Sequence, residues 1–425
     1  MRILYISADY GIPILGNKGG SVHVREMAKV FHQLGHEVFT ITPRMDGDES
    51  NHFCGNLIEI QIPGYEREIL QKLKDNGRGD RMEQALFKEI RSILSNRLIF
   101  DQIQALKRAH TIDLVYERFS LWNYSGVEAA KSIGVPHVLE VNAPLSIEQE
   151  KYRMLHLKSL ANGIEDVLFE KTDAIIAVSK GVKEYIKRRG IRASKIKVIP
   201  NSVDPDLFCP VTDRIEQSLK EKLNIPAGRC VIGFLGSLKK WHGVEVMIDA
   251  MRQLLSLALD VHLLVVGDGP LRSWIEDAMR KERLHTRITM AGEIPYSDVP
   301  DYIRVMDIPI APYLDIPEFY FSPIKIYEYM STGKPPVTSR IGQIPEVVQE
   351  GKTGLLCTPG SPDDLVKKIL FLMENPDVSQ AIGVRARKWI IRNSSWRKNA
   401  EKVLTIAEEL CQTNKRLVAG ELLTS

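Results

Sequence analysis

The stretch Phe321–Met330 carries the side chains best suited to chemistry on a phosphorylated ligand. Ser322 suits the N-cap of a helix and Pro323 its first position, which would place Lys325 and Glu328 on one face of that helix. A helix start offers backbone N–H groups and a partial positive charge, and Lys325 adds a full cation. Glu328 can accept hydrogen bonds from a sugar diol. The pattern suits a diphosphate attached to a sugar, although a capped surface helix with an ordinary Lys–Glu pair has the same signature.

A glycine-bearing loop follows the first expected strand, Arg2–Ser7, and ends in Lys18-Gly19-Gly20. Its paired glycines let backbone N–H groups approach a phosphate or hydroxyl, at the position where open α/β sheets bind ligands. The spacing is not G-x-G-x-x-G, and no acidic residue follows at the right distance, so a nicotinamide site is poorly supported. A flexible glycine loop without a ligand is the alternative.

Polar residues also end two strands of the first half. Asn142 follows the expected strand Val135–Val141, and Ser179 follows the strand Asp173–Val178. An N-cap on the next helix is a sufficient explanation for Ser179. The segment 65–110 is different, because it is rich in Arg, Lys and Glu with apolar residues at helical spacing. It predicts a solvated helical insertion, and the alternative is a set of basic helices that lie on a membrane face or meet an acidic acceptor.

Strands that alternate with amphipathic helices run through both halves of the chain, which predicts two α/β domains with doubly wound parallel sheets. The proline-rich segment 200–210 is the best candidate for an interdomain linker. We therefore expect domains at 1–204 and 205–384, facing each other across a cleft. Residues 385–425 are expected to form a helix followed by a tail. The helix either packs back across both domains or is a plain terminal helix.

Composition favours a water-soluble cytoplasmic protein. The 425 residues include 44% hydrophobic and 26% charged residues, and a net charge of +3 gives no general electrostatic case for nucleic acid or membrane binding. The five cysteines are scattered, which argues against a disulfide framework or a structural zinc site. The run Ile3–Ile6 is too short for a signal peptide, and no window approaches the length of a membrane span.

Several further motifs occur in order along the chain. They are Leu34-Gly35-His36-Glu37-Val38, Val198–Asp204, Gly236–Gly243, Gly267-Asp268-Gly269-Pro270, Pro312-Tyr313, Ser322–Met330, Gly333-Lys334-Pro335 and Gly351–Leu355. Together with the Lys18–Ser21 loop they make the chain resemble the group-1 family of retaining, nucleotide-sugar-dependent glycosyltransferases, roughly from Met1 to Trp396. Each motif is weak by itself, whereas the ordered set at family spacing is strong.

The resemblance implies the GT-B fold, with two facing Rossmann-like domains. It implies that Lys18, Gly19 and Gly20 contact the acceptor or the donor phosphates, and that Glu328, Lys325 and Asn142 are the catalytic candidates. Members generally need no metal, so cations and helix starts must stabilise the departing diphosphate. The donor-binding candidates are Ser237, Lys239, Lys240, His242, Gly267, Gly269, Glu293, Tyr320, Ser322 and Pro323.

The sequence departs from the family pattern at three places. The first of the two family glutamates falls on Tyr320, with Glu318 two residues earlier, and either residue can be its replacement. The usual arginine and lysine of the second-domain turn fall on Ser237 and His242, where Lys239 or Lys240 can supply the charge. The frequent histidine of the first domain is Asn142, which can donate a hydrogen bond to a sugar hydroxyl but cannot carry a proton at neutral pH.

These observations lead to the hypothesis of a cytoplasmic retaining hexosyltransferase that builds a polysaccharide or glycoconjugate. It would be free in the cytoplasm or peripheral at the inner membrane face. It would move a sugar from a nucleoside diphosphate to a hydroxyl of a glycan, a lipid-linked acceptor or a small molecule. A nucleotide-sugar epimerase on the same fold is one alternative. A non-catalytic sugar or nucleotide binder is another, motivated by Tyr320, Ser237 and His242. Donor sugar, base, acceptor, linkage and oligomeric state are left open by the sequence.

Overall fold

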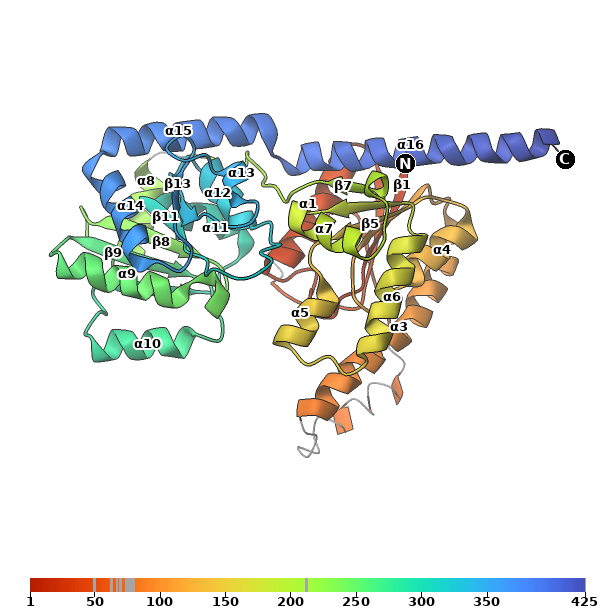
Figure 1. Ribbon diagram of the computed structural model, residues 1–425, viewed down its shortest axis with the longest axis horizontal. Helices are drawn as coiled ribbons and strands as arrows, with labels where there is room; N and C mark the ends of the chain where they lie inside the picture. Colours follow the sequence, from red (N-terminus) through yellow and green to blue (C-terminus); the bar gives the residue numbers. More distant parts are fainter. Residues whose placement is uncertain are drawn as a thin grey trace. The chain divides into compact units, whose positions relative to one another are not determined.

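The computed structural model describes residues 1–48, 51–61, 64–65, 68, 71–72, 81–210 and 213–424 of the chain. They form two compact units (Figure 1). The first unit combines Met1–Pro200 with Arg397–Ser425, and the second is Asn201–Trp396. The chain thus passes between the units twice, within the expected linker and again after Trp396, whereas a boundary was expected at 384/385.

The first unit is built on a seven-stranded parallel sheet in the order β3-β2-β1-β4-β5-β6-β7. Because β1 lies between β2 and β4, the strand order reverses beside β1, and the carboxyl ends at such a point are the usual ligand position. The strands are β1 (Arg2–Ser7), β2 (Glu37–Thr42), β3 (Asn56–Glu59), β4 (Leu114–Arg118), β5 (His137–Val141), β6 (Ala174–Ala177) and β7 (Ile196–Val198).

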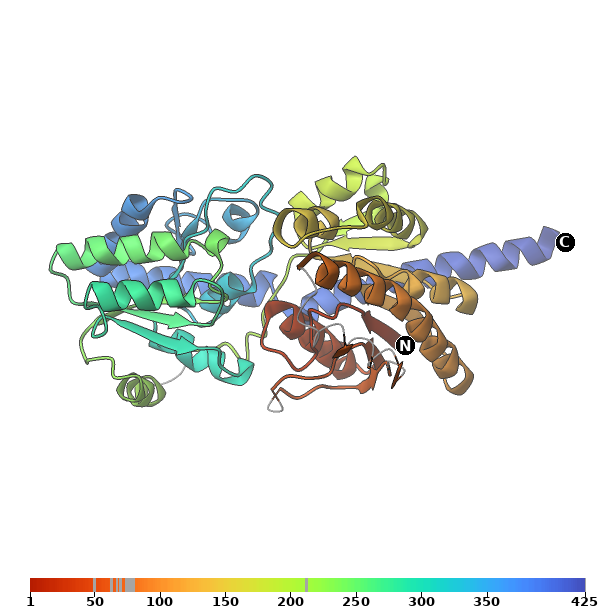
Figure 2. The same ribbon diagram turned by 90° about the horizontal axis from the view of Figure 1, so that it is seen from below.

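Helices cover both faces of this sheet (Figures 1 and 2). They are α1 (Gly19–Gln33), α3 (Arg81–Ala109), α4 (Ser125–Ile133), α5 (Leu145–Tyr152), α6 (Lys158–Lys171) and α7 (Lys180–Arg188). Part of the predicted helical insertion at 65–110 is α3, which packs on α4. Residues 66–67, 69–70 and 73–80 of that insertion lie outside the described residues. Ser179 caps α7 as predicted, since its Oγ accepts from the backbone N–H of Val182 at 3.1 Å.

The second unit has a six-stranded parallel sheet in the order β10-β9-β8-β11-β12-β13. Its strands are β8 (Cys230–Leu235), β9 (Val261–Val266), β10 (Ile288–Gly292), β11 (Ile308–Ala311), β12 (Val337–Ser339) and β13 (Leu355–Cys357). Its helices are α8 (Asp213–Lys222), α9 (Val244–Ser256), α10 (Arg272–Lys281), α11 (Val299–Val305), α12 (Ile324–Ser331), α13 (Ile344–Val347), α14 (Pro362–Glu374) and α15 (Pro376–Asn393). Two parallel doubly wound sheets confirm the predicted α/β fold class.

The helix expected within 385–425 corresponds to parts of two helices. α15 ends at Asn393 and α16 spans Trp396–Thr424. The break between them is held by Ser394, whose Oγ lies 2.8 Å from Ser202 Oγ. α15 packs on α12 within the second unit, whereas α16 belongs to the first unit from Arg397 onward and buries Ala400, Val403 and Ala407 there.

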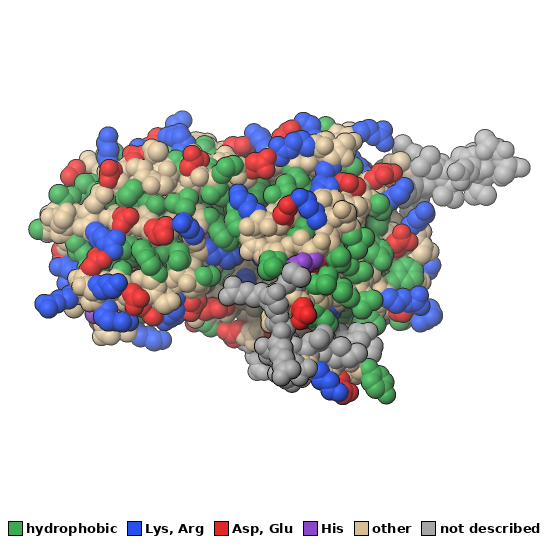
Figure 3. Space-filling model, turned by 60° about the horizontal axis from the view of Figure 1, so that its bottom comes forward, with side chains coloured by type: hydrophobic (Ala, Val, Ile, Leu, Met, Phe, Trp, Pro, Cys, Tyr) green, Lys and Arg blue, Asp and Glu red, His purple; other side chains and the backbone are tan. Residues whose placement is uncertain are grey.

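Charged side chains of both signs are interspersed on the face shown in Figure 3, which agrees with the small net charge. Within the described part of the chain, no helix is long and apolar enough to cross a membrane.

Candidate functional site

The turns after β8, β9 and β10 pack backbone to backbone at the carboxyl edge of the second sheet. The N–H of Gly267 donates to the carbonyl of Gly292 at 2.7 Å. A Cβ on Gly267 would lie 2.2 Å from Gly236 O, and a Cβ on Gly269 would lie 2.6 Å from Leu238 N. Only glycine permits this approach, so Gly267 and Gly269 shape the Gly236–Gly243 turn (the second-unit turn) by fixing its backbone.

α12 begins beside this turn, but its N-cap is not the residue that the sequence suggested. Its N-cap is Pro323, which makes no side-chain cap, and its first residue is Ile324. Ser322 is therefore not the N-cap that we expected. Its Oγ accepts from the N–H of Asn201 at 2.9 Å, and Asn201 Nδ2 donates to Ser322 O at 2.7 Å. Ser322 thus ties the start of α12 to the segment that enters the second unit.

Lys325 is the most unusual side chain of the site. It is only 9% exposed, and its Nζ has no hydrogen-bond partner among the residues that the structure describes. The ammonium lies over the rings of Phe234 (4.5 Å) and Tyr313 (5.7 Å), and a Cβ on Gly236 would lie 2.6 Å from it. Burial lowers the pKa of Lys325 to about 7, against the opposing effect of Glu328. A buried cation without a hydrogen bond is costly, and an anionic ligand would relieve that cost.

The cationic character of the second-unit turn does not come from His242. Burial, followed by the nearby charge of Lys325, lowers the pKa of His242 to about 3, so the ring is neutral at pH 7. Its Nδ1 lies 2.6 Å from Ser237 O and therefore carries the proton, which leaves Nε2 as an acceptor. Lys239 lies over the Trp241 ring at 4.9 Å, and Lys240 is exposed.

Glu328 lies one turn along α12 from Lys325 and is 4% exposed. Tyr320 is also buried and packs on the ring of Phe321 at 4.3 Å, whereas Glu318 is exposed. Glu293, after β10, is exposed as well. The structure thus gathers Lys325, Glu328 and the second-unit turn around the start of α12, with Glu293 on the surface.

In the first unit, the predicted glycine loop becomes the start of a helix. Gly19 and Gly20 are the first two residues of α1, and Lys18 is its exposed N-cap, without a side-chain cap bond. Arg25 braces the preceding loop, because its guanidinium donates to the carbonyls of Ile14 and Gly16, both at 2.6 Å. Backbone N–H groups at the start of α1 therefore have a fixed direction.

The sequence analysis missed a buried charge cluster around Glu140 in β5. His23 Nε2 lies 2.8 Å from Glu140 Oε1, Arg118 lies at 3.7 Å, Tyr116 donates to Oε2, and Asn142 Nδ2 donates to Oε1 at 2.7 Å. Burial acts to raise the pKa of Glu140, but His23, Arg118 and Tyr116 outweigh it and lower the pKa to about 2. The signal in the sequence is an acid between Leu139 and Val141 in a strand that is buried throughout.

This cluster determines which atom Asn142 can offer to a ligand. Ionised Glu140 only accepts hydrogen bonds, so the NH₂ group of Asn142 must face it. The atom left over is Asn142 Oδ1, which accepts from a hydroxyl. The sequence analysis expected Asn142 to donate such a bond, whereas the geometry favours acceptance.

Among the described residues, no group of three or more His, Cys, Asp or Glu side chains could hold a metal ion. Metal-independent action remains a prediction.

Family models cover most of the chain in two parts. Residues 215–389 match "Glycosyl transferases group 1", and residues 17–207 match "Glycosyltransferase Family 4". The chain belongs to the group-1 glycosyltransferases. Each match falls largely within one of the two α/β units. A glycosyltransferase is thus the enzyme class of this protein.

Individual relatives are distant and their names differ. The chain is 24% identical to alpha-maltose-1-phosphate synthase of Mycolicibacterium smegmatis, over 72% of this chain and 81% of that protein. It is 26% identical to 2-deoxystreptamine glucosyltransferase of Streptomyces kanamyceticus, over 67% of this chain and 74% of that protein. Shared family membership at this identity leaves donor and acceptor unassigned.

Solved structures confirm the GT-B fold. HepE of Anabaena, determined with UDP and glucose, superposes with a TM-score of 0.72 at 20% identity, covering 96% of this chain and all of that one. Sucrose-phosphate synthase of Thermosynechococcus elongatus also gives a TM-score of 0.72, at 17% identity, covering 97% of this chain and all of that one. At such identities the likeness extends to the fold alone.

Proposed function

We propose that this glycosyltransferase moves a sugar from a nucleoside diphosphate to a hydroxyl acceptor, with retention at the anomeric carbon. The observation that carries the proposal is Lys325, a buried ammonium to which no described residue makes a hydrogen bond, beside a glycine turn and a helix start. These groups complement a diphosphate both before and after it departs. HepE of Anabaena has been solved with UDP-glucose, which supports the same donor class.

The remaining roles follow from the chemistry of each group. Glu328 accepts hydrogen bonds from the ribose diol, and Lys325 stabilises the charge that develops on the leaving diphosphate. Neutral His242 accepts through Nε2 and so suits a donor hydroxyl. We assign the acceptor to the first unit, where Asn142 Oδ1 would orient a hydroxyl.

Retention is proposed to proceed by attack on the face from which the diphosphate leaves. Asn142 cannot carry a proton, and the pKa of His242 lies far below neutrality, so neither side chain acts as a base. The departing diphosphate would itself take the acceptor proton, while the protein supplies orientation and charge stabilisation. We propose this reaction without a metal, in the cytoplasm, with peripheral membrane contact where the acceptor is lipid-linked.

The test combines binding with turnover. The full chain is screened by thermal shift against UDP, GDP and ADP sugars, since a bound donor raises the unfolding temperature by mass action. Transfer or hydrolysis of the stabilising donor is then compared in Glu328→Ala and in a matched variant at an exposed glutamate of the same unit, Glu374→Ala. We expect a loss of about a hundredfold or more only in Glu328→Ala. Equal activity in both variants would refute the assignment, and turnover of the donor sugar without an acceptor would favour the epimerase.

A further inference from the structure

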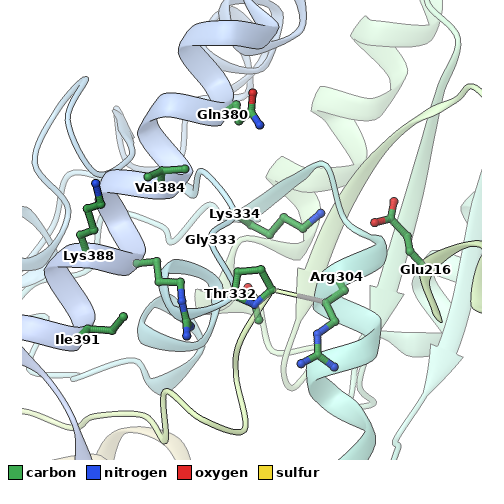
Figure 4. Close-up of a pocket in the computed structure, with 11 residues that line it drawn as sticks. Glu216, Arg304, Thr332, Gly333, Lys334, Gln380, Val384, Lys388 and Ile391 are labelled. Carbon is green, nitrogen blue, oxygen red and sulfur yellow. The ribbon is translucent and has the colours of Figure 1, made fainter. Parts of the chain in front are cut away.

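A cavity of about 450 Å³ lies beside α15 in the second unit, and none of the residues that line it belongs to the proposed donor site (Figure 4). Its walls come from α8, α11, α15 and the turn after α12. A Cβ on Gly383 of α15 would lie 1.9 Å from Gly333 O of that turn. Lys334 points toward α8, Lys388 points away from it, and Arg387 already donates to backbone carbonyls. These cations do not converge, so no single anion would contact all three.

The ring of Tyr313, in contrast, contacts two groups of the proposed donor site. Tyr313 follows the end of β11, and its side chain is buried. Its ring stands at 86° to the His242 ring, with 5.6 Å between the centroids, and the Lys325 ammonium lies 5.7 Å from its centroid. The carbonyl of Tyr313 accepts from Ser339 Oγ at 2.8 Å, which fixes its backbone. A rotation of this one ring would therefore change the surroundings of both donor-site groups.

Phe319 packs on the same ring from farther along the chain. The centroids of Phe319 and Tyr313 are 5.1 Å apart, and the two ring planes meet at 73°. The chain returns to Tyr313 through a turn at Pro317 and Glu318, and Glu318 has a φ of +59°. A left-handed conformation is unfavourable for glutamate. The contacts on either side of the turn must therefore hold it in place, and the packing of Phe319 on Tyr313 is one of them.

Gly342 fixes the position of Phe319. Gly342 has a φ of +55°, and a Cβ there would lie 2.4 Å from Phe319 Cδ1 and 2.8 Å from Phe319 O. The ring and the backbone of Phe319 thus lie directly on the loop that follows β12, an approach that only glycine permits. The Phe321 ring packs on Phe319 as well, at 5.2 Å. Phe319 is only 7% exposed, and these neighbours leave its ring little freedom to move.

We propose that Phe319 is a positioning residue for the donor site, which holds the Tyr313 ring in contact with His242 and Lys325. The inference rests on the proposed function, because that function assigns His242 and Lys325 to the donor. Phe319 acts through Tyr313. Without the Phe319 ring, Tyr313 would turn into the space left behind, and water would enter around the Lys325 ammonium.

The titration of Lys325 reports on this packing. The groups that face its ammonium are the rings of Phe234 in β8, Tyr313 and His242, and the carboxylate of Glu328 on α12. Burial is the largest cause of its low pKa of about 7, so water beside the ammonium would raise that pKa toward 10.5. A loss of packing elsewhere in the unit would lower stability without moving this titration.

The first experiment needs no ligand. Each full-length protein is compared with its own Lys325→Met counterpart, and the difference in unfolding temperature is followed from pH 7 to 10. In the wild type the contribution of Lys325 to stability rises with pH across this window, because the folded state loses the proton at lower pH than the unfolded state. In Phe319→Leu this rise should begin at least about one pH unit higher. The matched variant Phe208→Leu removes a buried ring of the same unit that packs on Tyr296, and it should lose stability but keep the wild-type titration.

The second experiment measures the binding of UDP, GDP and ADP at pH 6.5. For the nucleotide that binds the wild type, we expect Phe319→Leu to bind about tenfold more weakly and Phe208→Leu to bind as the wild type does. Gly342→Ala keeps the Phe319 ring but displaces it, so it should show the same two changes as Phe319→Leu.

The positioning role is overturned if Phe319→Leu and Gly342→Ala titrate and bind the nucleotide as Phe208→Leu does. If the wild type binds none of the three nucleotides, the proposed donor site is refuted instead. A delayed titration in Phe319→Leu would in that case still support the action of Phe319 on Lys325 through Tyr313.

Discussion

Both units bury a charged side chain near the carboxyl edge of their sheet, and they compensate that charge in opposite ways. Glu140 in the first unit is surrounded by His23, Arg118, Tyr116 and Asn142, and its pKa falls to about 2. Lys325 in the second unit lies over aromatic rings, makes no hydrogen bond within the described part of the chain and has a pKa lowered to about 7. A satisfied buried charge stabilises the fold and orients a neighbour. An unsatisfied one destabilises the empty protein and indicates where a ligand of opposite charge binds.

The largest expected effect is on catalysis, in Lys325→Met. Transfer should fall about 10³-fold, or about 4 kcal/mol in transition-state stabilisation, because the departing diphosphate loses its buried cation. Stability without ligand should be unchanged or higher, because the substitution removes a buried charge that no described residue satisfies with a hydrogen bond. Steady-state kinetics and thermal unfolding measure the two effects, with the exposed Lys367→Met as control. If Lys325→Met were less stable than the wild type, the charge of Lys325 would be compensated in the folded protein, as the charge of Glu140 is, and the contrast between the two units would be wrong.

The next effect is on stability, in Glu140→Gln. One of the two accepting oxygens would be replaced by an NH₂ group that faces other donors, and the negative charge would be lost, so we expect the free energy of unfolding to fall by about 3 kcal/mol. Urea unfolding measures it. Glu128→Gln, at an exposed residue of α4, should change stability by less than about 0.5 kcal/mol. If the two variants were equally stable, the cluster around Glu140 would not be a stabilising one.

A third effect is a pH dependence of stability and of UDP binding. Lys325 has its pKa lowered from 10.5 to about 7 by burial, so between these values the unfolded state binds more protons than the folded state. Its contribution to stability therefore rises with pH across this window, by at most about 1.4 kcal/mol per pH unit. UDP binding should change in the opposite direction, weakening above about pH 7 as the ammonium is lost.

The measurement is the difference in unfolding temperature between wild type and Lys325→Met from pH 7 to 10, with UDP titrations at the same pH values. Parallel curves for the two proteins would mean that Lys325 does not titrate in this window.

Two serines show how far local sequence can predict this structure. Ser179 and Ser322 both precede a helix, and the same capping argument applies to each. Ser179 caps α7, since its hydroxyl accepts from the backbone N–H of Val182 within the same turn. Ser322 instead accepts from the N–H of Asn201, a residue far away in the sequence. Local patterns thus gave the strands, the turns and most helices, whereas long-range partners decided what the polar side chains do.

The cluster around Glu140 and the cavity beside α15 were not predicted, because each is formed by residues far apart in the sequence. His23 and Glu140 lie on different elements, and nothing in the local pattern of either element indicates the other. The cavity depends on Gly383 lying against the backbone of Gly333, which no periodicity predicts. The break between α15 and α16 was likewise missed, since helical spacing continues through Ser394 and Ser395.

The division of the first unit into two chain segments has a consequence for the order of folding. Asn399 Nδ2 donates to Pro200 O, and Ala400, Val403 and Ala407 of α16 are buried in that unit. A ribosome makes this helix after the whole second unit, so the unit that begins first is completed last. Nascent chains would therefore carry an uncovered apolar surface on the first unit while the second unit folds, a period in which aggregation or chaperone binding competes with completion.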